Sequence, residues 1–93
     1  MKKPRLNQAV YLVHGDCISR EHVLMKGKDS FATECVFKAM YMEMYRQPMR
    51  YDEYGIAWTT DLAEAKRILA EDLQPGEKIV KVFDGYWEVR GKE

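Results

Sequence analysis

The stretch Lys78–Arg90 decides the fold class, and it reads KIVKVFDGYWEVR. Two runs of β-branched and aromatic residues flank the dipeptide Asp84-Gly85. This dipeptide favours a two-residue turn, because both turn positions need a positive φ. The stretch therefore predicts a β-hairpin with strands over 78–83 and 86–90.

The register of the hairpin follows from counting outward from its turn. The predicted cross-strand pairs are Phe83–Tyr86, Val82–Trp87, Lys81–Glu88 and Val80–Val89. In this register most of the apolar side chains share one face, and the other face carries a lysine–glutamate pair of opposite charge. A slip by one residue would spoil both faces, so the pattern favours this register over its neighbours.

The predicted elements before the hairpin are a mixture of strands and helices. In chain order they are a strand over 8–14, a segment over 19–26 that is either a short helix or a strand, a helix over about 31–46, a strand over 56–59 and a helix over about 61–72. The long helix begins after a cap at Asp29 or Ser30, and it ends before Pro48, which cannot continue a helix. The order predicts a single α+β domain over residues 1–93. Its sheet is small, mixed or antiparallel, with about four strands and both helices on one face.

Composition excludes several classes of function. The chain has 15 basic and 15 acidic residues, whereas a nucleic-acid-binding domain of this size is usually distinctly basic. Two cysteines are too few for the disulfide framework of a small secreted protein. The sequence contains neither a long apolar run nor the apolar core of a signal peptide, so it predicts a cytoplasmic protein with no membrane partner.

The long predicted helix carries two apolar stripes on different sides. One stripe contains Phe31, Cys35, Ala39 and Met42, and the other contains Phe37, Tyr41 and Met44. In a domain this small it is hard to bury both sides of one helix, so we expect the second stripe to contact a partner. The partner is either another protein or a second copy of the chain. In the alternative, the stripe packs beneath the following loop as a satellite core.

The loop after this helix supports the same interface. Arg50, Tyr51 and Tyr54 are residue types that dominate binding hot spots, and they follow the second stripe closely in sequence. In the alternative reading, the loop is a solvated connector whose tyrosines lie flat on the fold.

Four soft metal ligands stand out, namely His14, Cys17, His22 and Cys35. Their spacing fits no common zinc module, so the sequence predicts neither a metal nor a cofactor. Cys17 with a histidine base would make a nucleophile, but the sequence reveals no residue that orients such a pair. No catalytic residues are predicted.

One resemblance rests on three segments, VYLVHG over 10–15, VLMKG over 23–27 and YGIAWTTD over 54–61. Together they resemble the skeleton of ADP-ribosyltransferase-like domains. The resemblance implies that His14 and Gly15 hold the adenosine ribose and nicotinamide of NAD. It also implies that residues from Tyr54 to Trp58 stack on the nicotinamide. In the alternative, His14 is an ordinary strand-end histidine and Trp58 belongs to the core.

In style, the segment WTTD followed by a helix and a strand-rich end resembles small accessory proteins of phages and mobile elements, such as anti-CRISPR inhibitors. Our leading hypothesis is a non-enzymatic protein-binding module, a role that would suit a phage-type inhibitor of a host enzyme. Its predicted contact residues are Phe37, Tyr41, Met44, Arg50, Tyr51 and Tyr54. The rival hypothesis is a degenerate NAD-binding domain of the ADP-ribosyltransferase type.

Overall fold

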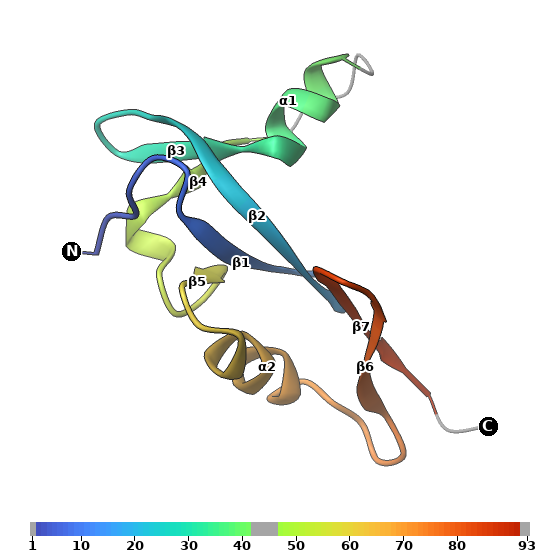
Figure 1. Ribbon diagram of the computed structural model, residues 1–93. Helices are drawn as coiled ribbons and strands as arrows, with labels where there is room; N and C mark the ends of the chain where they lie inside the picture. The colour runs from blue at the N-terminus through green and yellow to red at the C-terminus, as the bar shows by residue number, and fades with distance from the viewer. Residues whose placement is uncertain (1, 42–46, 92–93) are drawn as a thin grey trace.

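The computed structural model describes residues 2–41 and 47–91. Within these ranges the chain forms a curled sheet with two α-helices beside it (Figure 1). The elements are β1 (Ala9–His14), β2 (Cys17–Lys26), β3 (Ser30–Thr33), α1 (Glu34–Tyr41), β4 (Met49–Arg50), the 3-10 helix η1 (Tyr51–Glu53), β5 (Trp58–Thr59), α2 (Leu62–Ala70), β6 (Lys78–Phe83) and β7 (Tyr86–Arg90). The α+β class is confirmed. The sheet has seven strands in the described residues, so the expected number of about four was wrong.

Strand β2 is the centre of the sheet, and its two edges are used differently. One edge pairs with β1 along the whole of that strand, from Ala9 to His14. The other edge is shared, because β7 pairs with residues 17–19 and β3 pairs with residues 23–26. Between them, no strand of the described chain pairs with residues 20–22 on that edge. This gap between β7 and β3 positions the polar site described below.

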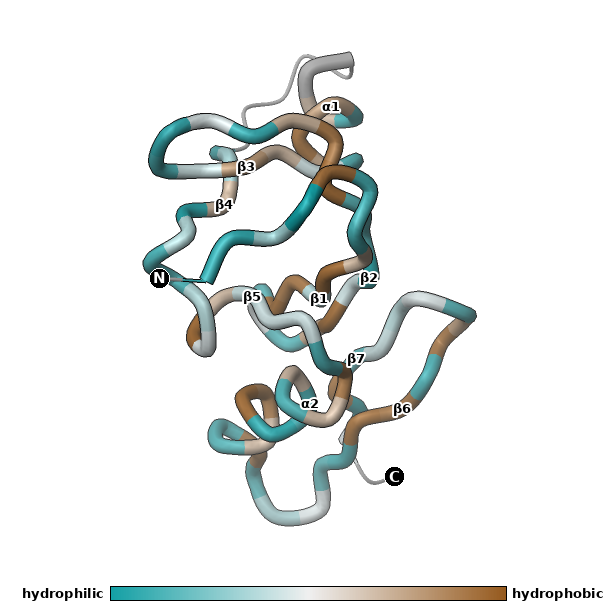
Figure 2. Tube along the Cα trace, turned by 60° about the vertical axis from the view of Figure 1, so that its left-hand side comes forward, coloured by the Kyte–Doolittle hydropathy of each residue, from teal (hydrophilic) through white to brown (hydrophobic). Residues whose placement is uncertain are grey.

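The core is divided between the two faces of the sheet. The buried residues of the first cluster are Val10, Leu12, Val23, Phe31, Tyr51 and Trp58. Those of the second are Ile18, Ala65, Leu69 and Trp87. Because side chains alternate along a strand, Leu12 belongs to the first cluster, whereas Tyr11 packs against the second. Figure 2 shows hydrophobic (brown) segments along β1, in keeping with apolar packing on both faces of this strand.

The two helices do not cover the same face, which corrects the expectation of both helices on one side. Helix α2 supplies Ala65 and Leu69 to the second cluster. Helix α1 contacts the first cluster instead, through Cys35. The reason is that α1 follows β3 directly, so it begins at the end of the sheet that is far from α2 (Figure 1).

Several elements agree with the sequence analysis. The predicted strand over 8–14 is β1, and the predicted helix over 61–72 is α2. Asp61 caps α2 as expected, since its carboxylate accepts a hydrogen bond from the backbone N–H of Ala63 at 3.3 Å. The segment over 19–26 that the sequence left open is strand, as part of β2.

The predicted start of the first helix was wrong. Residues 30–33 form β3, and the helix begins only at Glu34. Phe31 and Thr33 are buried while their neighbours are half-buried, which is the two-residue period of a strand. Pairing with β2 and β4 overrides the local preference for helix. The predicted end of this helix, over 42–46, lies outside the described residues.

The C-terminal hairpin is confirmed, but its register was predicted correctly only next to the turn. The observed pairs are Phe83–Tyr86, Lys81–Trp87, Val80–Glu88, Ile79–Val89 and Lys78–Arg90. The register shifts at Val82, which is the extra residue of a β-bulge. As a consequence Ile79, and not Val80, packs against the second core cluster.

Candidate functional site

An apolar groove lies between the β2–β3 turn and α1. It encloses about 320 Å³, and its apolar lining comprises Met25, Phe31, Ala32, Val36, Phe37 and Pro48. Phe31 is buried and forms the floor, whereas Met25 is 59% exposed and Phe37 is 38% exposed. The groove therefore presents a firm apolar floor with two accessible apolar side chains beside it.

The predicted second stripe of the helix reaches this groove through Phe37. The side chain of Tyr41 and the whole of Met44 lie outside the described part of the chain. Met25 and Pro48 were not predicted as contact residues. The sequence signal available for Met25 is its place two residues before Gly27, near the end of the predicted segment.

The predicted contact residues of the loop after α1 differ in their exposure to solvent. Tyr51 is only 1% exposed, its ring stacks on Phe31 with the centroids 5.8 Å apart, and its hydroxyl donates to the carbonyl oxygen of Gly27 at 2.9 Å. Arg50 is exposed, and its guanidinium forms two hydrogen bonds with the carboxylate of Asp52. Of these two predicted contact residues, only Arg50 is at the surface.

Trp58 is completely buried and occupies the centre of the first core cluster. Its ring lies edge to face with the rings of Phe31 and Tyr54, each with a centroid distance of 4.9 Å. Its indole N–H donates to the carbonyl oxygen of Arg50 at 2.8 Å. Tyr54 is half-buried beside it, and both belong to the core side of the structure rather than to an open cleft.

His14 belongs to a second region, a polar cluster at the end of the β1–β2 hairpin. Gly15 has a φ of 60° and opens the turn that places His14 opposite Cys17 in the ladder. The Cys17 Sγ lies 3.3 Å from His14 Nδ1, and His14 Nε2 lies 3.2 Å from Ser19 Oγ. Ser19 in turn donates to Glu21 Oε2 at 2.8 Å. Cys17, Ser19 and Glu21 share one face of β2 because they are two residues apart.

Glu21 lies in the gap between β7 and β3, and its buried carboxylate links β2 to the start of α1. It accepts hydrogen bonds from Thr33 Oγ1 at 2.6 Å and from the backbone N–H of Cys35 at 2.9 Å, in addition to Ser19. Burial alone would raise the pKa of this carboxyl, but the hydrogen bonds from Thr33, Cys35 and Ser19 outweigh it, and the pKa is lowered. Glu21 is therefore ionised at neutral pH.

Glu34 closes the same gap from the helix side. Its carboxylate accepts hydrogen bonds from the backbone N–H of His22 and from His22 Nδ1, the latter at 2.9 Å. Desolvation raises the pKa of Glu34, but the hydrogen bonds from His22 outweigh it and the pKa is lowered. A carboxylate thus replaces the missing strand as the partner of the β2 backbone.

A cavity of about 290 Å³ opens beside this polar cluster. His14, Ser19 and Glu21 line it from the sheet, Lys38 from α1, and Tyr86 from β7. The hydrogen bond with Cys17, together with burial, raises the pKa of Tyr86 to about 12, so its hydroxyl stays protonated and can donate.

Sequence reasoning identified His14 and Cys17 but missed Ser19, Glu21 and Thr33. The available signal was the alternation of polar residues at 17, 19 and 21, which places them on one face of a strand. In the described part of the chain no three His, Cys, Asp or Glu side chains come together as a metal site. The four soft ligands named above do not converge there, and His22 bonds with Glu34 instead.

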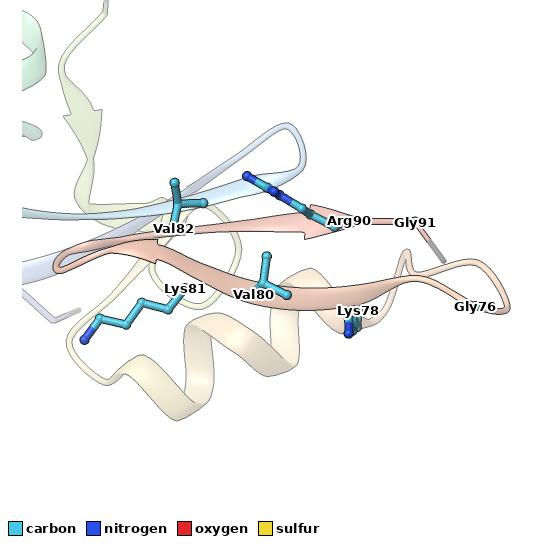
Figure 3. A pocket seen from close by; sticks show the side chains of 7 residues that line it. All are labelled: Gly76, Lys78, Val80, Lys81, Val82, Arg90 and Gly91. Carbon is cyan, nitrogen blue, oxygen red and sulfur yellow. The ribbon is translucent and has the colours of Figure 1, made fainter. Parts of the chain in front are cut away.

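A further hollow, of about 730 Å³, runs along the C-terminal hairpin. Figure 3 shows that Val80 and Val82 project from one side of the hairpin, whereas Lys81 projects from the other. Its lining side chains therefore do not converge on one point, and they include no acid, histidine, serine or cysteine. We assign no site there.

Comparison of the chain with models of protein families, with curated proteins and with solved structures finds no match. None of the helices in the described ranges is long and apolar enough to cross a bilayer. Function is therefore argued from the geometry of the groove and of the polar cluster.

Proposed function

We propose that the protein is a protein-binding module, and that it docks an apolar segment of another protein in the groove between the β2–β3 turn and α1. The observation that carries the proposal is the exposure of Met25 and Phe37 beside an apolar cavity. Contiguous apolar surface at a concave site is typical of an interface, and a flexible methionine adapts to the shape of a partner.

The energetics favour a partner that buries both side chains. Full burial of a methionine or phenylalanine side chain is worth about 1.5–3 kcal/mol, of which the free protein has gained only part. The floor is rigid, since the ring of Phe31 is held by Tyr51 and Trp58, so docking costs little rearrangement there. Lys26 at the edge of the groove supplies a polar rim.

The resemblance to phage and mobile-element accessory proteins extends this proposal to the kind of partner. The partner would be a host enzyme, and the protein would inhibit it by occupying a surface rather than by chemistry. As the sequence analysis expects, Tyr41, Met44 and Arg50 would also contact this partner.

The test is an affinity pull-down from a cell lysate with the wild type and with a Phe37→Asp variant. A matched control is Phe83→Asp, which changes another exposed phenylalanine, 61% exposed, on the β6–β7 hairpin. We expect a stoichiometric partner that is captured by the wild type and the control and is lost by Phe37→Asp. Capture that is unchanged in Phe37→Asp, or the absence of any partner, would contradict the proposal. Sedimentation of the purified protein detects the homodimer that the sequence left as an alternative.

The NAD-binding alternative has no comparable observation in its favour. Both ring faces of Trp58 are enclosed within the first core cluster, and Tyr54 packs against it. His14 is engaged with Cys17 and Ser19. A cleft between β1 and β5 is not available either, because the two strands pair directly, Leu12 with Trp58.

A further inference from the structure

A second hollow lies next to the apolar groove, and the two share a wall. Phe31 lines the groove and Tyr51 lines the second hollow, and their rings stack with the centroids 5.8 Å apart. The Tyr51 hydroxyl also donates to the carbonyl oxygen of Gly27, which lines the groove. The second hollow, here called the basic hollow, measures about 350 Å³ and is lined by Lys3, Lys28, Asp29, Arg50, Tyr51 and Asp52. A segment that is seated in the groove can therefore reach the basic hollow.

The N-terminal segment brings further positive charge to this place. Pro4 is buried and holds the segment against the fold. As a result the Nζ atom of Lys3 lies 5.2 Å from the centroid of the Tyr51 ring, and that of Lys2 lies 5.0 Å from the centroid of the Tyr54 ring. The two lysines are thus fixed beside the basic hollow by contacts with aromatic faces.

Positive charge is concentrated in the three segments that meet here, although the whole chain is neutral. Residues 2–5, 26–29 and 50–53 contain six basic and three acidic side chains, whereas the rest of the chain contains nine basic and twelve acidic ones. The field of such a region extends over about 8–10 Å at physiological salt, which is enough to cover the neighbouring groove. The surroundings of the groove therefore favour a partner of negative charge.

The cations of this region are available to a partner. Among the described residues, no ion pair engages Lys3, Lys26 or Lys28. Arg50 pairs with Asp52, but both side chains are about half exposed, at 61% and 47%. An exposed pair of this kind adds little to stability, so a carboxylate from a partner can replace Asp52 at low cost.

We propose that the segment that docks in the groove is acidic, and that it carries Asp or Glu residues next to its apolar anchors. The anchors contact Met25 and Phe37, while the carboxylates meet Lys26 at the rim of the groove and Lys28 and Arg50 at the basic hollow. This inference rests on the proposed docking function and names the chemistry of the partner. An acidic protein segment fits better than a nucleic acid, because the carboxylates of Asp29 and Asp52 repel phosphates and the groove is apolar.

The experiment is a selection of random peptides displayed on phage, with the immobilised full chain as the target. We expect the enriched peptides to share two apolar positions and an excess of Asp and Glu over Lys and Arg. Binding of one enriched peptide, labelled with fluorescein, is then measured by fluorescence anisotropy. Raising the NaCl concentration from about 50 to about 500 mM should weaken its binding to the wild type by about 10-fold.

Three variants separate the charge from the groove, with folding checked by circular dichroism. Lys28→Glu should weaken binding of the peptide by about 5-fold or more. The matched control is Lys66→Glu, which makes the same change of charge at an exposed position on α2 and should leave binding unchanged. Phe37→Asp should abolish binding, because it places a charge in the groove.

The outcomes distinguish this inference from the docking function itself. Enriched peptides that need Phe37 but are neutral or basic would retain the groove as a docking site and overturn the acidic partner. Equal binding to Lys28→Glu and Lys66→Glu would do the same. A labelled oligo(dT) that binds as tightly as the enriched peptide would show that the basic hollow recognises phosphates, and it would also overturn the inference. If no peptide is enriched, or if binding persists in Phe37→Asp, the docking function fails and the inference fails with it.

Discussion

The carboxylate of Glu21 accepts a hydrogen bond from the backbone N–H of Cys35 at 2.9 Å, so strand β2 caps helix α1 from the side. The first N–H groups of a helix have no partner within the helix, and a negative charge near them is favourable. Thr33, which precedes the helix, directs its hydroxyl to the same carboxylate. One buried side chain thus joins the sheet, the helix start and, through Ser19, the cluster around Cys17.

The first prediction concerns this cap. Glu21→Ala leaves the Thr33 hydroxyl and the Cys35 N–H without their buried acceptor, and we expect it to lower the free energy of unfolding by about 2–3 kcal/mol. Urea denaturation at pH 7 measures the change. The control is Glu71→Ala, which removes an exposed ion pair with Arg67 and should cost less than about 1 kcal/mol. Equal effects of the two substitutions would contradict the role assigned to Glu21.

A second prediction is that the protein loses stability in acid through Glu21 and Glu34. The pKa of each carboxyl is lowered from its ordinary value of 4.5 in the folded protein. The unfolded chain therefore binds protons first as the pH falls, so the stabilisation is fully present above about pH 4.5 and is lost as the pH falls through the folded pKa values. The urea concentration at the midpoint of unfolding, measured from pH 7 down to pH 3, should decrease as the pH falls below about 4.5. Glu21→Gln should be less stable at pH 7 and show a shallower fall, and a fall as steep as that of the wild type would contradict the prediction.

Local signals account for the part of the fold that was predictable from the sequence. The cap at Asp61 and the turn at Asp84-Gly85 act within a few residues, so α2 and the hairpin were found. Strand β3 was missed, because Phe31 and Thr33 are also compatible with the start of a helix. Pairing with β2 on one side, and with β4 beyond helix α1 in the chain on the other, makes this segment a strand. The bulge at Val82 was missed because no rule of turn chemistry predicts it. The bulge lets Ile79 pack against the second core cluster, to which α2 contributes.

The candidate sites were predictable to a smaller extent. Phe37 is exposed, as helical periodicity predicts, whereas Tyr51 is buried, and residue type alone does not predict such burial. His14 and Cys17 were noticed as reactive types. Glu21 was not noticed, because Thr33 and Cys35 come close to it only in the folded sheet. They bond with it at the part of the β2 edge, between β7 and β3, that has no strand partner.

A third prediction concerns the β1–β2 turn that sets the contact between His14 and Cys17. Gly15 has a φ of 60°, and a Cβ atom at this position would meet nothing within 4 Å, so substitution there tests backbone conformation alone. We expect Gly15→Ala to lower the free energy of unfolding by about 1–2 kcal/mol, and Gly15→Asn by less, because asparagine tolerates the left-handed region. The control is Gly91→Ala, at a position that has equal space and no positive φ, and it should be nearly neutral. Similar melting temperatures for Gly15→Ala and Gly91→Ala would contradict the prediction.

A fourth prediction tests the contact between Tyr86 and Cys17 directly. The hydrogen bond to Cys17, with burial and the nearby negative charges of Glu88 and Asp16, raises the pKa of Tyr86 from 10.0 to about 12. Removing the sulfur in Cys17→Ala eliminates the largest of these causes, so the pKa of Tyr86 should fall back toward 10. NMR of protein labelled with carbon-13 at the tyrosine Cζ atom follows the titration, and Tyr86→Phe assigns the Tyr86 signal among the six tyrosines. Cys35→Ala is the matched control and should leave this pKa unchanged. If Tyr86 titrates at the same pH in both cysteine variants, the hydroxyl does not contact Cys17, and the polar cluster lacks the donor that we assign to it.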